Sequence, residues 1–192
     1  MERRQPDRVL IAMGVCGAGK SVLAHLLASR LGVPFVEADI HHSDAARLAM
    51  SRGEPLSDAE RLPWLDRVGQ AAGVALEKSG GVVIACSALR KTYRDRLRTH
   101  LPGAFFVHLA GDRDLIASRL DGRRDHFVGR PLLDSQISTL EPLALDENGM
   151  VLDVAAPLGQ LAETVLHKMG DADTIASLDT GPVPDTFAIR KN

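Results

Sequence analysis

Short apolar runs alternate along this chain with longer segments in which apolar residues recur every three or four positions. The runs are almost continuously apolar, as in strands that are buried on both faces of a parallel sheet, and they cover residues 8–13, 33–38, 81–86, 104–109 and 150–154. The segments with helical spacing cover residues 20–31, 58–78, 89–100, 112–122, 132–141 and 158–169. This alternation predicts an α/β fold, a three-layer sandwich in which helices cover a mainly parallel, five-stranded sheet.

Two stretches interrupt the alternation. Residues 40–57 lengthen the connection between the second and third predicted strands, and the polar, arginine-rich residues 121–134 follow the fourth. Extra length at such connections is typical of functional loops. The last residues, 171–192, are rich in Gly, Asp, Thr and Pro without periodicity, which indicates a mobile tail or a segment that docks on a partner.

Length and charge narrow the possibilities. A chain of 192 residues predicts one domain, over residues 1–170, with the tail behind it. Lys and Arg total 23 against 25 Asp and Glu, a net charge of −2, which argues against a nucleic-acid partner. No apolar run approaches the ~18 residues that span a bilayer, and none near the N-terminus is long enough for a secretory signal. We therefore expect a cytoplasmic protein with no membrane partner, in which Cys16 and Cys86 are reduced packing residues.

A phosphate-binding motif directly follows the first predicted strand. Residues 14–21, here called the phosphate loop, read GVCGAGKS and match G-x-x-x-x-G-K-[ST] between a strand and a helix. Glycines let backbone N–H groups approach a phosphate, and the helix directs its positive end at the same anion. Lys20 would reach the β and γ phosphates and the Ser21 hydroxyl would hold Mg²⁺. The motif thus predicts a P-loop NTPase-type fold that binds the phosphates of a nucleotide, interpreted here as ATP, through Gly14, Val15, Cys16, Gly17, Ala18, Gly19, Lys20 and Ser21.

The phosphate loop indicates a nucleoside triphosphate but not the reaction. The chain contains no guanine-reading N-K-x-D, and its third predicted strand ends in Cys86 and Ser87, where many ATPases carry an aspartate. Small-molecule kinases of this size often lack that acid and place one at the end of the second strand. Asp39 stands at that position.

Asp39 should face the phosphate loop across the cleft, because ligands of such sheets bind outside the carboxyl ends of the strands. A carboxylate there accepts or positions the proton of an attacking hydroxyl, and it would also contact Mg²⁺ through water. His42, three residues later, is a candidate partner of the acceptor. The alternatives are a helix-capping or solvated aspartate and a surface histidine.

Four further segments carry a specific resemblance. They are GEPLSDAERLPWL (53–65), CSALRKTYRDRLR (86–98), HF (126–127) and LLDSQISTLEP (132–142). In this order behind the phosphate loop, they resemble the gluconate kinase family, small ATP-dependent sugar-acid kinases related in fold to shikimate and adenylate kinases. The resemblance covers about residues 9–169. It implies a homodimeric kinase that transfers a phosphoryl group from ATP to D-gluconate, giving 6-phosphogluconate.

The resemblance also implies a small helical acceptor lobe over residues 40–78. Gluconate carries a carboxylate and a row of hydroxyls, and a guanidinium fork suits a carboxylate. Arg61 and Arg94 would therefore grip the acid, and further substrate contacts would come from Asp39, His42, Ser87 and His126. Surface ion pairs on a helix are the alternative interpretation of both arginines.

Residues 121–134 are similar to the lid of these kinases. An arginine-bearing flap that closes over ATP expels water and brings positive charge to the transferring phosphoryl group. Arg119 and Arg123 would contact ATP, and Arg123 would join Lys20 and Asp39 in catalysis. A solvated basic loop is the alternative interpretation.

The acceptor lobe departs from the family pattern. The family has glycine, proline, asparagine and lysine where this chain has Ala38, Ser43, Ala46 and Ala49. Loss of an amide and an ammonium group removes partners for a polyhydroxy acid, so a shikimate-like hydroxylated acid or a nucleoside monophosphate stays open as the acceptor. A nonenzymatic ATP-binding sensor is the alternative from another class, although the intact CSALRKTYRD and LLDSQ segments favour an enzyme.

Overall fold

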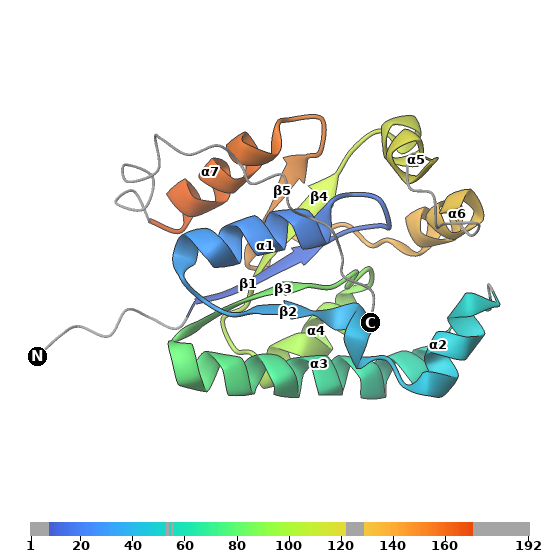
Figure 1. Ribbon diagram of the computed structural model, residues 1–192, viewed down its shortest axis with the longest axis horizontal. Helices are drawn as coiled ribbons and strands as arrows, with labels where there is room; N and C mark the ends of the chain where they lie inside the picture. Colours follow the sequence, from blue (N-terminus) through green and yellow to red (C-terminus); the bar gives the residue numbers. More distant parts are fainter. Residues whose placement is uncertain (1–7, 53, 55, 122–128, 171–192) are drawn as a thin grey trace, which may run out of the picture.

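The sheet at the centre of the fold is wholly parallel. A computed structural model describes residues 8–52, 54, 56–121 and 129–170. Within these residues the strands are β1 (Arg8–Met13), β2 (Phe35–Glu37), β3 (Gly81–Ala85), β4 (Phe105–Ala110) and β5 (Gly149–Asp153). They pair in the order β2-β3-β1-β4-β5, and every neighbouring pair is parallel. β1, which leads into the phosphate loop, is therefore the central strand (Figure 1).

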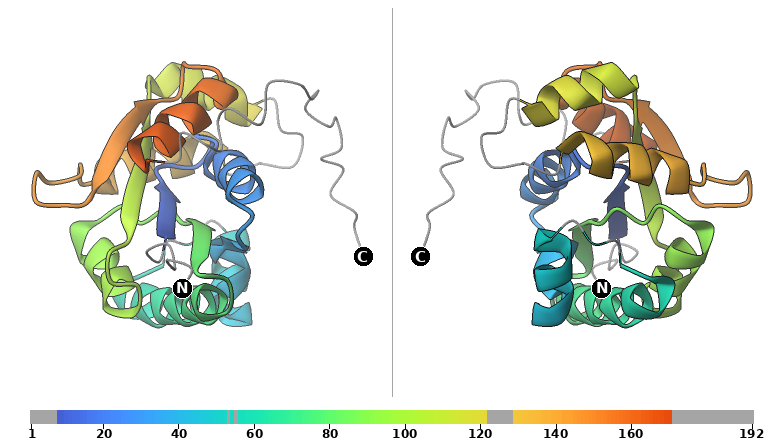
Figure 2. Two further views of the ribbon diagram at one scale, coloured as in Figure 1. Left: turned by 90° about the vertical axis from the view of Figure 1, so that its left-hand side faces the viewer. Right: turned by 90° about the vertical axis from the view of Figure 1, so that its right-hand side faces the viewer.

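Helices cover both faces of the sheet. They are α1 (Lys20–Leu31), α2 (Asp44–Ser51), α3 (Asp58–Ser79), α4 (Lys91–His100), α5 (Arg113–Asp121), α6 (Gly129–Thr139), α7 (Leu158–Lys168) and the 3₁₀ helix η1 (Ala38–His41). Helices α1 and α7 lie on one face, and α3 and α4 lie on the other (Figures 1 and 2). This confirms the predicted α/β sandwich. None of the helices in the described residues has the length and apolar character needed to cross a bilayer.

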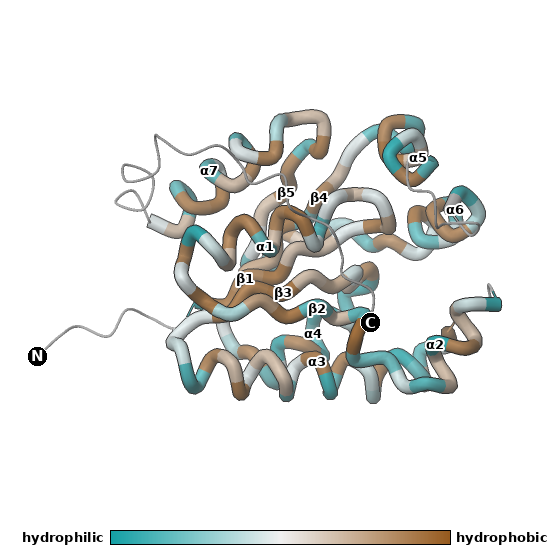
Figure 3. The backbone as a smooth tube through the Cα atoms, viewed as in Figure 1, coloured by the Kyte–Doolittle hydropathy of each residue, from teal (hydrophilic) through white to brown (hydrophobic). Residues whose placement is uncertain are grey.

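Alternate residues of β1 belong to two separate cores. Leu10 and Ala12 pack with buried residues of α1, α5 and α7, whereas Val9, Ile11 and Met13 pack with those of α3 and α4. Because side chains of a strand point alternately to opposite faces, burial of both faces produces the continuous apolar run seen in the sequence. Figure 3 shows hydrophobic positions concentrated along the central strands.

The main differences from the predicted elements lie between β2 and α3. The apolar run predicts a strand over 33–38, but β2 covers only Phe35–Glu37, because the chain turns into η1 at Ala38. The long connection over 40–57 contains α2, which the apolar spacing does not predict. Ser43 is the N-cap of α2, and its Oγ accepts the N–H of Ala46 at 3.2 Å. This departure from the family pattern therefore begins a helix.

Helix α3 is attached to η1, the turn that directly follows β2. Ser57 and Glu60 form a capping box at the start of α3, which fixes where that helix begins. One turn later the buried Trp64 donates its indole N–H to the carbonyl oxygen of Ala38 at 2.8 Å. Helix α3 and η1 are thereby held together directly behind the strand end that carries Asp39.

Candidate active site

The phosphate loop runs from the end of β1 into α1 on a path that demands glycine. Gly14 has φ +137° and Gly17 has φ +79°, values that L side chains rarely adopt. A Cβ on Gly14 would lie 2.7 Å from the Leu109 carbonyl oxygen, and one on Gly17 would lie 2.7 Å from Leu120 Cγ. The loop can follow this path, tight against β4 and α5, only because both positions lack a side chain.

Lys20 and Ser21 are the first residues of α1, at the positive end of its dipole. The Nζ of Lys20 donates to the carbonyl oxygen of Val15 at 2.9 Å, across the phosphate loop. Burial lowers the pKa of Lys20, and the nearby Asp39 carboxylate opposes that shift. The ammonium group is thus poorly hydrated beside the loop, which favours binding of an anion that restores its lost solvation.

A cavity of about 150 Å³ opens beside the phosphate loop. Its walls include Lys20 and Ser21 from the start of α1, Glu37 from the end of β2 and Asp39 from η1. The other lining residues are Cys16, Gly17, Gly19, Val22, Ala85, Cys86 and Leu120. The structure therefore brings the phosphate loop and Asp39 to one cavity at the carboxyl edge of the sheet.

Glu37 is an acidic group of this cavity that sequence reasoning missed. It is the last residue of β2, two positions before Asp39. Both carboxylates act on Lys20, where their negative charges counter the fall in its pKa. Its place at the predicted strand end, two residues before Asp39, was the only signal for it. Because the chain turns into η1 at Ala38, strand alternation does not relate the two side chains, and the shared cavity is seen only in the structure.

His42 is a packed residue rather than a surface one. Its ring stacks on the indole of Trp64 with the centroids 4.3 Å apart, and only 6% of the residue is exposed. Burial lowers the pKa of His42, with Asp39 acting in the opposite direction. Its Nδ1 is buried and has no hydrogen-bond partner among the described residues. A buried ring nitrogen of this kind is suited to a hydrogen bond with a bound molecule.

Arg61 lies near the start of α3, against the ring of Tyr93. The guanidinium carbons of Arg61 and Arg90 lie 5.9 and 5.8 Å from the ring centroid, so two cations approach this ring. Asp58 pairs with Arg90 and accepts the Tyr93 hydroxyl. The Nε of Arg61 donates to the Leu56 carbonyl at 3.0 Å. Since no carboxylate in the described part of the chain pairs with Arg61, its terminal N–H groups stay available to another anion.

Ser87 lies beside the phosphate loop and not in the wall of the cavity. Its carbonyl oxygen accepts the N–H of Gly14 at 3.2 Å, which ties the end of β3 to the loop. The next residue, Ala88, has φ +43°, a conformation that costs free energy in a residue other than glycine. The segment after β3 is thus held in a specific shape where it meets the loop.

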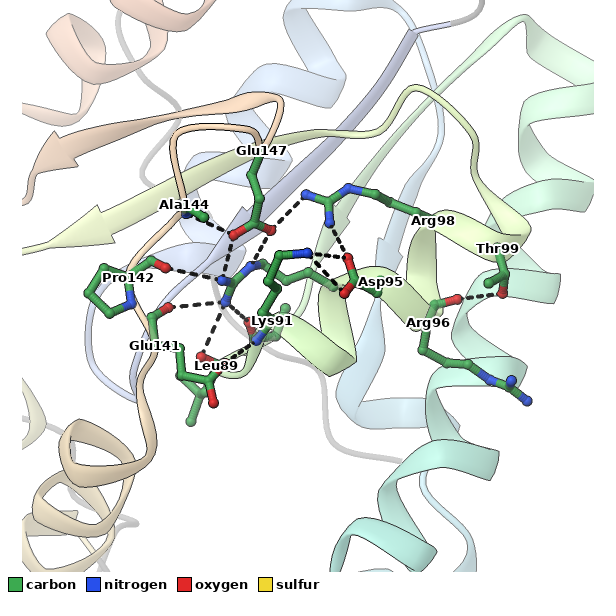
Figure 4. Close-up of polar contacts among 12 residues, drawn as sticks. Leu89, Lys91, Asp95, Arg96, Arg98, Thr99, Glu141, Pro142, Ala144 and Glu147 are labelled. Carbon is green, nitrogen blue, oxygen red and sulfur yellow. Dashed lines mark hydrogen bonds and ion pairs between the residues drawn. The ribbon is translucent and has the colours of Figure 1, made fainter.

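Arg94 is a structural residue, which corrects the expectation that it grips the acid. Its side chain is fully buried, and its Nε and Nη2 donate to the two carboxylate oxygens of Glu147 at 2.8 and 2.7 Å. Its other N–H groups donate to the carbonyl oxygens of Ala88, Leu89, Glu141 and Pro142 (Figure 4). A guanidinium has five N–H donors, and these partners satisfy them all. Arg94 instead fastens α4 to the segment that leads into β5.

The structure describes the flanks of the expected lid. Arg119, in the last turn of α5, donates from Nη2 to the Val154 carbonyl at 2.7 Å, so it lies against the segment that follows β5. Arg130 of α6 pairs with Asp121 of α5. Arg123 and His126 lie outside the described residues, so the roles expected for them stay predictions.

Helix α6 brings a second polar group that sequence reasoning missed. The Oε1 of Gln136 accepts the backbone N–H of Cys16 at 2.6 Å, across 120 residues of sequence. Gln136 belongs to the LLDSQ segment that carries much of the family resemblance. No local spacing rule pairs residues so far apart, so only the fold reveals this contact with the phosphate loop.

Both cysteines are free thiols. Burial raises the pKa of Cys86 to about 12, and burial also raises the pKa of Cys16, although Lys20 acts against that shift. Reactive cysteines have a lowered pKa. The interpretation of both as packing residues is therefore consistent with their surroundings.

Comparison with known proteins extends over most of the chain. Residues 16–151 match the family model described as shikimate kinase. A probable gluconokinase of Rattus norvegicus is 40% identical over 179 residues, covering 84% of this chain and 97% of the relative. The crystal structure of a gluconokinase from Sinorhizobium meliloti 1021 is 34% identical with a TM-score of 0.77, covering 91% of this chain and 98% of that one. An unliganded sugar kinase from Janibacter sp. HTCC2649 is 40% identical with a TM-score of 0.81, covering 88% and 98%. The family model spans most of the phosphate loop together with α2, α3 and α6. With relatives of about 40% identity over most of its length, the chain belongs to the gluconokinase family.

Proposed function

We propose that this protein transfers the γ-phosphoryl group of ATP to the terminal hydroxyl of D-gluconate, forming 6-phosphogluconate and ADP. The observation that carries the proposal is the cavity that Lys20, Ser21 and Asp39 line together. It combines a phosphate-binding loop with a carboxylate at the carboxyl edge of one parallel sheet, where proteins of this class bind ligands. The relatives named gluconokinase, one of them 40% identical over 179 residues, support gluconate as the acceptor.

The nucleotide side of the cavity fits a triphosphate. The phosphate loop has the positive-φ glycines that turn backbone N–H groups toward an anion, and Lys20 adds a partly buried cation beside them. Mg²⁺ prefers hard oxygen ligands, and the Ser21 hydroxyl and the carboxylates of Glu37 and Asp39 line this cavity. Ser21 would hold the ion directly and Asp39 through water. When bound, the ion neutralises charge on the β and γ phosphates.

Asp39 serves the acceptor hydroxyl. Its carboxylate accepts the hydroxyl proton while the hydroxyl oxygen forms a bond to the γ phosphorus and the bond from that phosphorus to the bridging oxygen of ADP breaks. Negative charge spreads over the transferring group, and Lys20 and the loop N–H groups stabilise it without having to reorganise. This division of labour needs the phosphate-binding loop and the carboxylate at one cavity, and the shared lining of Lys20, Ser21 and Asp39 supports it.

Arg61 and His42 recognise the acid on the acceptor side. Arg61 approaches the aromatic ring of Tyr93 and has no carboxylate partner among the described residues, so it is placed to pair with the carboxylate of gluconate. The buried, unpartnered Nδ1 of His42 suits one of the sugar hydroxyls. Because Ala46 and Ala49 replace polar residues of the family pattern, these two side chains would carry most of the recognition.

Other features implied by the family resemblance belong to the same proposal. Arg119 binds ATP, and Arg123 and His126 complete the site from the lid, whose central residues lie outside the described part of the chain. The protein works as a cytoplasmic homodimer, with residues 1–170 as one kinase domain and 171–192 as a tail. Sedimentation of the purified protein tests the dimer.

An acceptor panel tests the proposed function. The protein is incubated with MgATP and D-gluconate, D-glucose, shikimate or AMP, and formation of ADP and of 6-phosphogluconate is followed with coupling enzymes. We expect turnover with gluconate at about 1–100 s⁻¹, the range of most kinases, and little with glucose, which lacks the carboxylate. ADP formation with gluconate no faster than with water alone would contradict the proposal, as would faster turnover of shikimate or AMP.

A further inference from the structure

Gln136 is a polar group that the proposed reaction leaves without a role. Its Oε1 accepts the N–H of Cys16 at 2.6 Å, a short distance for an N–H···O hydrogen bond. Cys16 lies between Gly14 and Gly17, whose positive φ values set the path of the phosphate loop. Gln136 of α6 thus forms a hydrogen bond with the phosphate loop between its two positive-φ glycines.

Helix α6 is a firm support for this contact. Leu133, one turn before Gln136, is fully buried in an apolar cluster that also contains Val15 of the phosphate loop. Just beyond the helix, the carbonyl oxygen of Glu141 accepts a hydrogen bond from the buried Arg94 at 3.1 Å. Both attachments leave α6 little freedom to move relative to the loop, so Gln136 is presented to Cys16 from a fixed position.

The neutral amide of Gln136 suits a position beside the phosphate loop. A glutamine amide supplies a neutral acceptor oxygen, whereas a glutamate in the same position would supply an acceptor with a negative charge. Phosphate oxygens bind beside this loop, and a negative charge there would repel them. An acceptor that must lie next to a triphosphate without opposing it is therefore best provided by an amide.

We propose that Gln136 is a positioning residue for phosphoryl transfer. By accepting the Cys16 N–H, it fixes the peptide group that joins Val15 to Cys16, so that the following N–H groups keep their direction toward the cavity lined by Lys20 and Ser21. This inference rests on the proposed function. Backbone N–H groups that are already oriented need not reorganise when negative charge develops on the transferring phosphoryl group. If the loop peptide could rotate, these N–H groups would first have to be reoriented.

Two substitutions and a control separate this role from simple stabilisation. Gln136→Leu removes the acceptor, Gln136→Glu keeps an acceptor but adds charge, and Ser135→Ala changes an exposed neighbour on the same helix. Each variant is examined by amide hydrogen exchange at Cys16, by MgATP binding, by kcat and both KM values, and by the ratio of ADP to 6-phosphogluconate formed.

The variants should differ in a specific pattern. In Gln136→Leu we expect faster amide exchange at Cys16. Both kcat and MgATP affinity should fall about 3- to 10-fold, the size of one hydrogen bond. The KM for gluconate should stay unchanged, and the ratio of ADP to 6-phosphogluconate should rise above one. In Gln136→Glu we expect slow exchange at Cys16 to persist while MgATP binds more weakly than in Gln136→Leu. Ser135→Ala should match the wild type throughout.

Two results would overturn the inference. One is unchanged exchange at Cys16 in Gln136→Leu, and the other is faster exchange with wild-type kcat, MgATP affinity and ADP-to-product ratio, which indicates a contact that only stabilises the fold. If the wild type forms no 6-phosphogluconate, the proposed function fails by itself. The exchange and MgATP-binding measurements still decide then whether Gln136 holds the loop in its binding conformation.

Discussion

The nucleotide side of the candidate active site is formed mainly by backbone, and the acceptor side by side chains. On the nucleotide side the backbone of the phosphate loop makes the site, and its glycines are there because no side chain fits. On the acceptor side the proposed site consists of side chains: Asp39 of η1 lines the cavity, whereas His42, next to η1, and Arg61 of α3 are not among the lining residues. A site made by the backbone leaves a pattern in the sequence, whereas a side-chain site leaves only residue types that occur equally often elsewhere.

Two arginines illustrate this difference. Arg61 and Arg94 are equally suited by type to a sugar acid, yet only Arg61 keeps terminal N–H groups without a carboxylate partner among the described residues. All the donors of Arg94 are used within the protein, on the buried carboxylate of Glu147 and on four backbone carbonyl oxygens. The partner of a side chain decides its function here, and that partner lies 53 residues away in the sequence.

The largest expected effect is that of Asp39→Asn on catalysis. Loss of the proton acceptor should lower kcat by about 10²- to 10⁴-fold, the usual contribution of general-base catalysis, while MgATP affinity stays near the wild-type value. Steady-state kinetics and calorimetric titration with MgATP measure the two quantities. Asp44→Asn, an exposed change in the first turn of α2, is the control. A kcat close to wild type would remove Asp39 from the reaction.

Arg94→Met should produce the largest loss of stability. Hydrogen bonds from Arg94 hold the pKa of Glu147 to about 2, so the variant leaves a buried carboxylate partly unpaired. Breaking such a pair costs about 3–5 kcal/mol of unfolding free energy, which urea denaturation measures. Arg96→Met, which breaks a more exposed ion pair with Asp66, should cost much less, because solvent screens an exposed pair. If Arg94→Met had wild-type stability and a raised KM for gluconate, Arg94 would be a substrate-binding residue and not a structural one.

Arg61→Leu should have a moderate and selective effect. A hydrogen bond to a charged partner contributes about 1.5–3 kcal/mol, so the KM for gluconate should rise about 10- to 100-fold while the KM for ATP changes little. Arg52→Leu, an exposed change at the end of α2, is the matched control in the same lobe. Equal rises in both KM values would show that Arg61 supports the fold of the lobe and does not hold the acid.

The smallest expected effect concerns His108, a core residue of β4 outside the cavity. Burial and the nearby Arg94 lower its pKa, and both ring nitrogens lack a hydrogen-bond partner among the described residues. In the unfolded chain His108 binds a proton near the ordinary histidine pKa of about 6.5, whereas in the folded chain it binds one only at lower pH. Stability therefore falls as the pH drops below about 6.5, down to the lowered pKa of the folded state, and is independent of this group above that range.

His108→Leu removes this titration. Urea denaturation at pH values of about 8 and 5.5 compares the variant with the wild type. Because an unsatisfied buried polar group costs about 1–3 kcal/mol, we expect the variant to gain about 1 kcal/mol at the higher pH and more at the lower one. An equal gain at both pH values would contradict the assignment of the acid effect to His108.

Much of the fold could be predicted because burial on both faces of a parallel strand gives an unbroken apolar run. Strand β1 and helix α1 have the bounds that the pattern predicts. Helix α2 could not be predicted from apolar spacing, since Ala46 is its single buried residue. The end of β2 could not be predicted from the sequence either, because the predicted strand continues to Ala38 although pairing with β3 stops at Glu37.

The candidate site was predictable to the extent that local rules define it. The spacing of glycines, lysine and serine marks the phosphate loop, and a strand end marks Asp39. The pairing of Gln136 with Cys16 spans 120 residues and depends on how α6 packs against the loop. Side chains that act through distant partners can be assigned only when the fold shows those partners.

The most direct test of the account is a crystal structure of the protein with D-gluconate and a nonhydrolysable ATP analogue. We predict that the phosphates lie on the N–H groups of the phosphate loop with Lys20, and that the carboxylate of gluconate contacts Arg61. The terminal hydroxyl should lie about 2.6–3.2 Å from an oxygen of Asp39, as proton transfer requires. A terminal hydroxyl that points away from Asp39, or gluconate bound outside the cavity, would contradict the account.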